Sequence, residues 1–124
     1  MDRSKKHILV IEDDEVVVKP LQLALREEGF QVEIAKNGEE GITMFYKAMP
    51  NLVLLDLVLP KTNGFEVLEK IRLDAALHEI PIVILSNLAR EGEIKRGLAG
   101  GATRYIVKTN FSLDNLIGII KNYF

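Results

Sequence analysis

The chain has 124 residues, the size of a single domain, with 48% apolar residues and a formal net charge of −2. This composition supplies enough apolar surface for one packed core. The absence of cysteine excludes disulfides and thiolate metal sites. Acidic and basic residues are interleaved without a basic stripe, so the sequence gives no indication of direct nucleic-acid binding.

No segment approaches the roughly 20 consecutive apolar residues that a helix needs to span a bilayer. The apolar run after the polar N-terminus, Ile8–Ile11, is too short for the core of a signal peptide. We therefore expect a soluble, cytoplasmic protein without membrane contact, made of one domain over residues 1–124.

Short apolar runs alternate along the chain with longer segments of helical period. Each run has about four residues, is rich in Val and Ile, and lacks polar alternation, which is typical of strands covered on both faces. The predicted strands are Ile8–Ile11, Val32–Ala35, Leu52–Leu55, Ile82–Leu85 and Tyr105–Val107.

Five helices are predicted between and after these strands: Glu15–Glu28, Gly38–Ala48, Phe65–Ala76, Arg90–Ala99 and Ser112–Tyr123. Pro20 lies inside the first and predicts either a kink near Val16 or a late start. The alternation indicates an α/β fold of (βα)5 type, in which right-handed crossovers place helices on both faces of a doubly wound five-stranded parallel sheet. Strand order 2-1-3-4-5 is expected by analogy with such folds.

Polar residues follow four of the predicted strands. Glu12 and Asp13 follow the first, Asp56 the third, Ser86 the fourth and Lys108 the fifth. In a doubly wound fold these strand ends open onto one crevice. Several carboxylates there repel one another, which raises their pKa values. A hard cation such as Mg²⁺, which takes oxygen ligands, relieves that repulsion.

Each of these residues also has a plainer explanation. Asp14 is a suitable helix N-cap, Ser86 a loop cap and Lys108 an ordinary surface lysine. Asp56 is harder to explain in this way, because it interrupts the apolar stretch Leu52–Leu59, where a carboxylate needs a partner or a function. The coincidence of such residues at four strand ends favours a functional site.

Four motifs resemble those of response-regulator receiver domains, and the resemblance extends from His7 to Phe124. The motifs are Ile8–Asp14, Asp56–Gly64, Ile84–Ser86 and Gly101–Lys108. The resemblance implies a signalling switch of a two-component or phosphorelay system. Such a protein is not a conventional enzyme, since it catalyses only its own Mg²⁺-dependent phosphorylation and dephosphorylation.

The resemblance assigns a role to each polar residue at the strand ends. Asp56 would accept the phosphoryl group, and Mg²⁺ would be held by Asp13, Asp56 and the carbonyl of Val58, with Glu12 helping through a water molecule. Gly64, just before a helix, occupies a position where we expect a residue that tolerates unusual φ.

The remaining roles concern the transferred group and the response to it. Lys108 and Ser86 would contact phosphoryl oxygens, and Tyr105 would be the aromatic residue that changes rotamer with Ser86. The donor would be a phosphohistidine on a histidine kinase or a histidine phosphotransfer protein. A downstream protein partner would bind the face made by the fourth helix, fifth strand and fifth helix.

Three positions depart from the family's common pattern. Asn87 stands where a small residue usually follows the switch hydroxyl, Thr109 stands where a proline in a cis bond usually follows the lysine, and Arg104 replaces a common acidic residue. The first two are the support for an alternative, a receiver-shaped interaction module that works without phosphorylation.

Two enzymatic or redox alternatives are disfavoured. A phosphatase with an aspartyl nucleophile would need a second acid where Val58 stands. A flavin-binding electron carrier would need hydroxyls and glycines around its phosphate where this chain places carboxylates.

Overall fold

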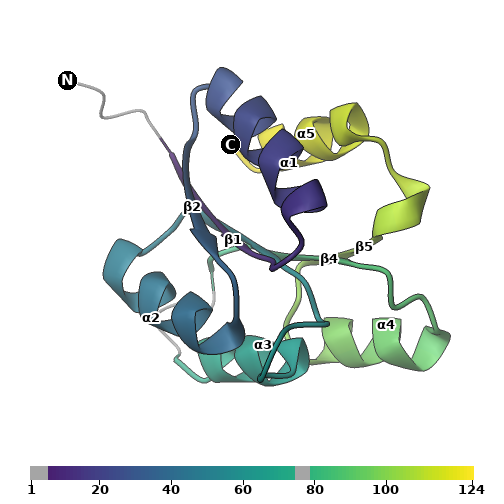
Figure 1. Cartoon of the computed structure of the whole chain (residues 1–124). Coiled ribbons are helices and arrows are strands. Elements are labelled where there is room, and N and C mark those ends of the chain that lie inside the picture. The colour runs from purple at the N-terminus through teal and green to yellow at the C-terminus, as the bar shows by residue number, and fades with distance from the viewer. Residues whose placement is uncertain (1–5, 75–78) are drawn as a thin grey trace.

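The computed structural model describes residues 6–74 and 79–124, which form a five-stranded parallel sheet in the order β2-β1-β3-β4-β5 (Figure 1). This confirms the doubly wound fold and its strand order. The elements in chain order are β1 His7–Ile11, α1 Glu15–Glu27, β2 Gln31–Ala35, α2 Gly38–Ala48, β3 Leu52–Leu55, α3 Gly64–Arg72, β4 Ile82–Ser86, α4 Glu91–Ala99, β5 Arg104–Val107, the 3₁₀ turn η2 Lys108–Asn110 and α5 Leu113–Lys121.

Helices cover both faces of the sheet, with α1 and α5 on one side and α2, α3 and α4 on the other (Figure 1). Residues of one strand therefore alternate between two cores. Ile8 and Val10 pack in the core beneath α1 and α5, whereas Leu9 and Ile11 pack beneath the other three helices. Because both faces are covered, the strands show no polar alternation.

Helix α1 begins at Glu15 and continues through Pro20, so the late start is excluded. Asp14 is its N-cap, and one of its carboxylate oxygens accepts a hydrogen bond from the amide of Val16 at 3.0 Å. Pro20 lies on the exposed side, and the helix buries Leu21 among its inward residues.

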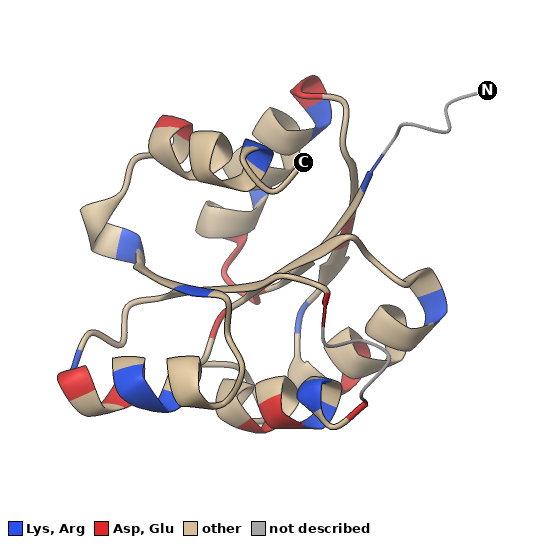
Figure 2. Ribbon diagram, turned by 180° about the vertical axis from the view of Figure 1, so that it is seen from behind, with Lys and Arg blue, Asp and Glu red and all other residues tan. Residues whose placement is uncertain are grey.

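The predicted third helix was too long. α3 ends at Arg72, and Leu73 caps it while remaining 83% exposed. The last two residues predicted for this helix, 75 and 76, lie outside the described residues. No helix in the described ranges is both long and apolar enough to cross a membrane. Figure 2 shows charged residues of both signs interspersed over the ribbon.

Candidate functional site

Asp56 lies immediately after β3, at the carboxyl edge of the sheet. Its amide donates a hydrogen bond to the carbonyl of Ile11 at 3.0 Å, which fixes the backbone beside the end of β1. The residue is only 5% exposed. One side-chain oxygen, Oδ1, accepts a hydrogen bond from the amide of Val58 at 3.3 Å. The carboxylate is thus buried at a defined position.

The end of β1 brings two further carboxylates to the same place. Oxygen atoms of Glu12, Asp13 and Asp56 all lie within 4.8 Å of one another. Glu12 is buried, and its Oε2 accepts a hydrogen bond from the amide of Asp14 at 3.1 Å, whereas Asp13 is exposed. The structure therefore brings together the three acidic side chains that the sequence nominates.

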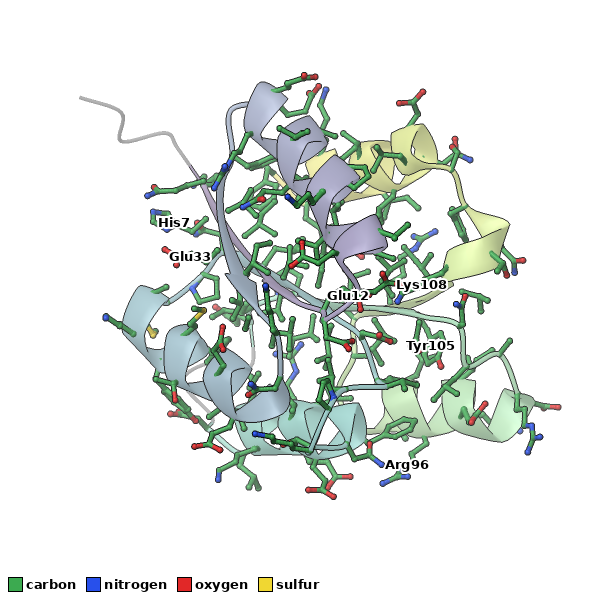
Figure 3. The ribbon with its side chains drawn as sticks, in the orientation of Figure 1. His7, Glu12, Glu33, Arg96, Tyr105 and Lys108 are labelled. Atoms are coloured by element: carbon green, nitrogen blue, oxygen red, sulfur yellow. The ribbon has the colours of Figure 1, made fainter. Side chains whose placement is uncertain are left out.

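Lys108 links two of these carboxylates from the end of β5. Its Nζ lies 3.2 Å from Oδ2 of Asp56 and 2.5 Å from Oε1 of Glu12, and its side chain is 15% exposed. Figure 3 shows Lys108 and Glu12 meeting at this edge of the sheet. The pairing with Glu12 was not foreseen, because no sequence pattern relates two residues that lie 96 positions apart.

The buried charges alter one another's protonation. Burial raises the pKa of Glu12 from 4.5 to about 7, the charge of Asp56 adds to this, and the contact with Lys108 opposes it. Burial alone would lower the pKa of Lys108, but the neighbouring Glu12 and Asp56 outweigh burial and raise it. The cleft thus holds more negative than positive charge when all its groups are ionised.

These residues line a cleft of about 490 Å³ together with four exposed neighbours, Asp14, Glu15, Val58 and Asn87. The donor set fits a Mg²⁺ ion, because all three candidate side chains offer carboxylate oxygens. Oε1 of Glu12 is buried and is paired with the ammonium of Lys108, so one positive charge already lies against this group of carboxylates.

Ser86 and Tyr105 are both connected to Leu88. Ser86 is fully buried at the end of β4, and its Oγ accepts a hydrogen bond from the amide of Leu88 at 3.3 Å. The hydroxyl of Tyr105 donates to the carbonyl of the same residue at 2.6 Å. The sequence nominates the two hydroxyls and the apolar side chain of Leu88, but it does not predict this role of Leu88, because the contacts are made by its backbone atoms.

Gly64 is needed for a different reason from the one expected. Its φ is not among the positive values, which among the described glycines occur at Gly29 and Gly101. A Cβ atom at position 64 would instead lie against the Cα of Leu57 and 2.5 Å from the carbonyl oxygen of Asp56. Backbone proximity beneath the cleft, and not an unusual φ, requires glycine here.

The bond between Lys108 and Thr109 is trans, as are all peptide bonds in the described ranges. Lys108 to Asn110 form the turn η2, which the sequence did not predict. Thr109 therefore does not prevent Lys108 from reaching the two carboxylates.

A family model described as "Response regulator receiver domain" matches residues 8–121. Among curated proteins, the chain is 36% identical over 108 residues to "DNA-binding response regulator MtrA" of Mycolicibacterium smegmatis, covering 87% of this chain and 46% of that protein. It is 37% identical over 108 residues to "Probable transcriptional regulator ycf27" of Cyanophora paradoxa, covering 87% and 44%. The chain thus spans a little under half the length of these relatives.

Solved structures show the same similarity. A "response regulator receiver domain protein (CheY-like)" from Methanospirillum hungatei superposes with a TM-score of 0.85 at 30% identity, covering 95% of this chain and 92% of that one. The beryllofluoride-activated receiver domain of Klebsiella pneumoniae RstA gives a TM-score of 0.85 at 26% identity, covering 94% and 97%.

Proposed function

Because this chain belongs to the response regulator receiver domain family, we propose that it is a switch in which Asp56 is the phosphoacceptor. The observation that supports this most directly is the position of Asp56, buried among two other carboxylates and within 3.2 Å of the ammonium of Lys108. The reaction transfers a phosphoryl group from a phosphohistidine. A carboxylate oxygen of Asp56 forms the new bond to phosphorus, the bond between phosphorus and the imidazole nitrogen breaks, and its electron pair stays on the imidazole.

Asp13, Asp56 and the Val58 carbonyl would hold Mg²⁺, with Glu12 helping through a water molecule. The ion, when bound, neutralises charge that spreads over the phosphoryl oxygens. Lys108 contributes a second positive charge at the same place, since its ammonium already contacts the acceptor. Such positioned charges are most of what phosphoryl transfer requires of a protein.

The phosphoryl group adds nearly two negative charges and new acceptor oxygens beside Asp56. Ser86 would donate its hydroxyl proton to one of them while its oxygen keeps the hydrogen bond from the Leu88 amide. Tyr105, whose hydroxyl donates a hydrogen bond to the carbonyl of Leu88, would respond by a shift in population between two side-chain arrangements. The face made by α4, β5 and α5 would then bind a downstream protein partner.

The donor would be a histidine kinase or a histidine phosphotransfer protein. The names of the mycobacterial relatives describe DNA binding by proteins of about twice this length, and we assign no DNA contact to the present residues. The alternative of a module that works without phosphorylation is not favoured, because Asp13, Asp56 and Lys108 are all present and in contact range.

The test is the intact mass of the protein after incubation with acetyl phosphate and Mg²⁺. We expect a single adduct of about 80 Da, the mass of one phosphoryl group, that is absent in Asp56→Asn. Asp114→Asn, which changes an exposed aspartate in the first turn of α5, is the matched control and should keep the adduct. An adduct that persists in Asp56→Asn would show that the acceptor is another residue.

A further inference from the structure

Gly97 lies in the interior of α4 and is buried against the sheet. Its φ is not positive, so its backbone conformation does not require glycine. The space around it does. A Cβ atom at this position would lie 2.7 Å from Cδ1 of Ile84 and 3.0 and 3.1 Å from two ring carbons of Tyr105. A methyl group here would be closer to both side chains than ordinary van der Waals contact allows, so Ile84, Tyr105 or the helix must shift to admit it.

Ile84 and Tyr105 are neighbours across β4 and β5, so both side chains stand on the face of the sheet that α4 covers. Figure 3 shows Tyr105 between the sheet and α4. In this position the ring is half-buried and its hydroxyl reaches the carbonyl of Leu88. The missing side chain of Gly97 leaves the room that the ring occupies.

Continuous contacts therefore run from α4 to the cleft. Gly97 borders the ring of Tyr105, the hydroxyl of Tyr105 binds the carbonyl of Leu88, and the amide of Leu88 binds Ser86. Ser86 ends β4, the strand beside the one that carries Asp56. Each step is a direct contact between buried or half-buried groups, so a movement at one end has a physical route to the other.

We propose that Gly97 is a positioning residue for Tyr105. The space that it leaves beneath α4 permits the inward ring position, in which the hydroxyl of Tyr105 donates a hydrogen bond to the carbonyl of Leu88. Gly97 thereby couples the position of α4 on the sheet to the Asp56 cleft. The part of the proposal that concerns the inward ring position does not depend on phosphorylation, whereas the coupling to phosphorylation rests on the proposed function. With a methyl group at position 97, the ring is displaced outward or α4 is lifted.

A second glycine in α4, Gly92, provides a matched control for Gly97→Ala. Gly92 lies in the same helix, is exposed, and has nothing within 4 Å of the place where its Cβ would be. Alanine favours a helix interior over glycine, so Gly92→Ala should leave Tyr105 unchanged and raise the urea midpoint. Gly97→Ala makes the same chemical change five residues further along the same helix and should lower that midpoint.

The direct readout is NMR on protein with labelled tyrosine rings, without phosphoryl donor. We expect nuclear Overhauser contacts between the ring of Tyr105 and the δ1 methyl of Ile84 in the wild type and in Gly92→Ala. Gly97→Ala should weaken or abolish them. Unchanged contacts in folded Gly97→Ala would overturn the proposal, because the ring would then not depend on the space that glycine leaves.

A double variant covers the case in which Gly97→Ala does not fold. Ile84→Val removes Cδ1, the atom nearest to the added methyl group, so Ile84→Val with Gly97→Ala should recover stability. Its ring contacts from Tyr105 to the shortened side chain should remain weaker than in Ile84→Val alone. Equal contacts in the two proteins would assign Gly97 a role in packing against Ile84 only, and would refute positioning of Tyr105.

A second arm measures the coupling to phosphorylation with acetyl phosphate and Mg²⁺. Gly97→Ala should still take the phosphoryl adduct, but the change in the Tyr105 ring signals that accompanies the adduct in the wild type should be lost. A wild-type response in Gly97→Ala would overturn the coupling. Absence of an adduct in the wild-type protein would refute the proposed function instead, and would leave the comparison made without phosphoryl donor standing.

Discussion

Ionisation of Glu12 should make the free energy of unfolding depend on pH. Glu12 has a folded-state pKa of about 7, raised from 4.5 chiefly by burial. A raised carboxyl pKa means that folding favours the protonated form. The stabilisation is therefore fully present below about pH 4.5 and is lost as the pH rises through about 7. We expect Glu12→Gln, whose amide cannot ionise, to lack this loss.

The size of the effect follows from the two pKa values. A change in carboxyl pKa from 4.5 to about 7 corresponds to roughly 3 kcal/mol between the two ends of the titration. This is an upper bound, because Glu12 interacts with the charges of Lys108 and Asp56, and these side chains can rearrange as Glu12 ionises. A domain of this size has about 5–15 kcal/mol of stability in total, so even half of that effect is measurable.

The assay is urea unfolding between pH 5 and pH 8.5 in EDTA. The free energy of unfolding of the wild type should fall with rising pH relative to Glu12→Gln, by about 1–3 kcal/mol over this range. Glu27→Gln, which neutralises an exposed glutamate of α1, should follow the wild type. Added Mg²⁺ should reduce the loss at high pH. Parallel pH profiles for the wild type and Glu12→Gln would refute the assignment of a perturbed Glu12.

Three further predictions concern residues that line the cleft or lie next to it. Asp13→Ala should weaken Mg²⁺ binding at least about tenfold in calorimetry and raise the melting temperature in EDTA through relief of carboxylate repulsion. We expect the phosphorylated wild type to last minutes to hours, because the apolar side chains of Val58 and Leu88 cannot orient a water molecule to attack the phosphoryl group. Val58→Asn combined with Leu88→Glu should shorten that lifetime several-fold. Gly64→Ala should cost about 1–3 kcal/mol in urea unfolding, because its Cβ meets backbone atoms.

Each of these has a contrary result. A lower melting temperature of Asp13→Ala in EDTA would mean that its carboxylate stabilises the fold without the ion. Equal rates of phosphoryl loss would show that positions 58 and 88 do not control the access of water. Unaltered stability of Gly64→Ala, with Gly118→Ala as the open-space control, would mean that the loop before α3 can move away at no cost.

The sequence predicts the sheet well, because β1, β3 and β4 are buried on both faces and are apolar except for His7 and Ser86 at their ends. The same pattern locates Asp56, since a carboxylate inside such a run is conspicuous. Element ends are less predictable. α3 ends at Arg72 although apolar residues continue, and α1 continues through Pro20. Both outcomes depend on tertiary packing, which local propensity does not contain.

The parts of the site that could not be predicted are relations between distant residues or backbone atoms. The pairing of Lys108 with Glu12 depends on how closely β5 and β1 ends approach across the cleft. The role of Leu88 comes from its amide and carbonyl, which every residue possesses. The reason for Gly97 appears only when Ile84 and Tyr105 are placed around it.

Under the proposed function, the arrangement of charges explains how the half-buried Lys108 can assist phosphoryl transfer to Asp56, a carboxylate that it already contacts. Lys108 is shared between Glu12 and Asp56, so one ammonium faces two carboxylates. Glu12, with a pKa of about 7, can be neutralised by a proton or by a neighbouring cation at little cost near neutral pH. Either event leaves the whole charge of Lys108 available to Asp56. The exposed position of Asp13 suits this division, since under the proposed function it would add a metal ligand at the mouth of the cleft and no contact with Lys108 is required of it.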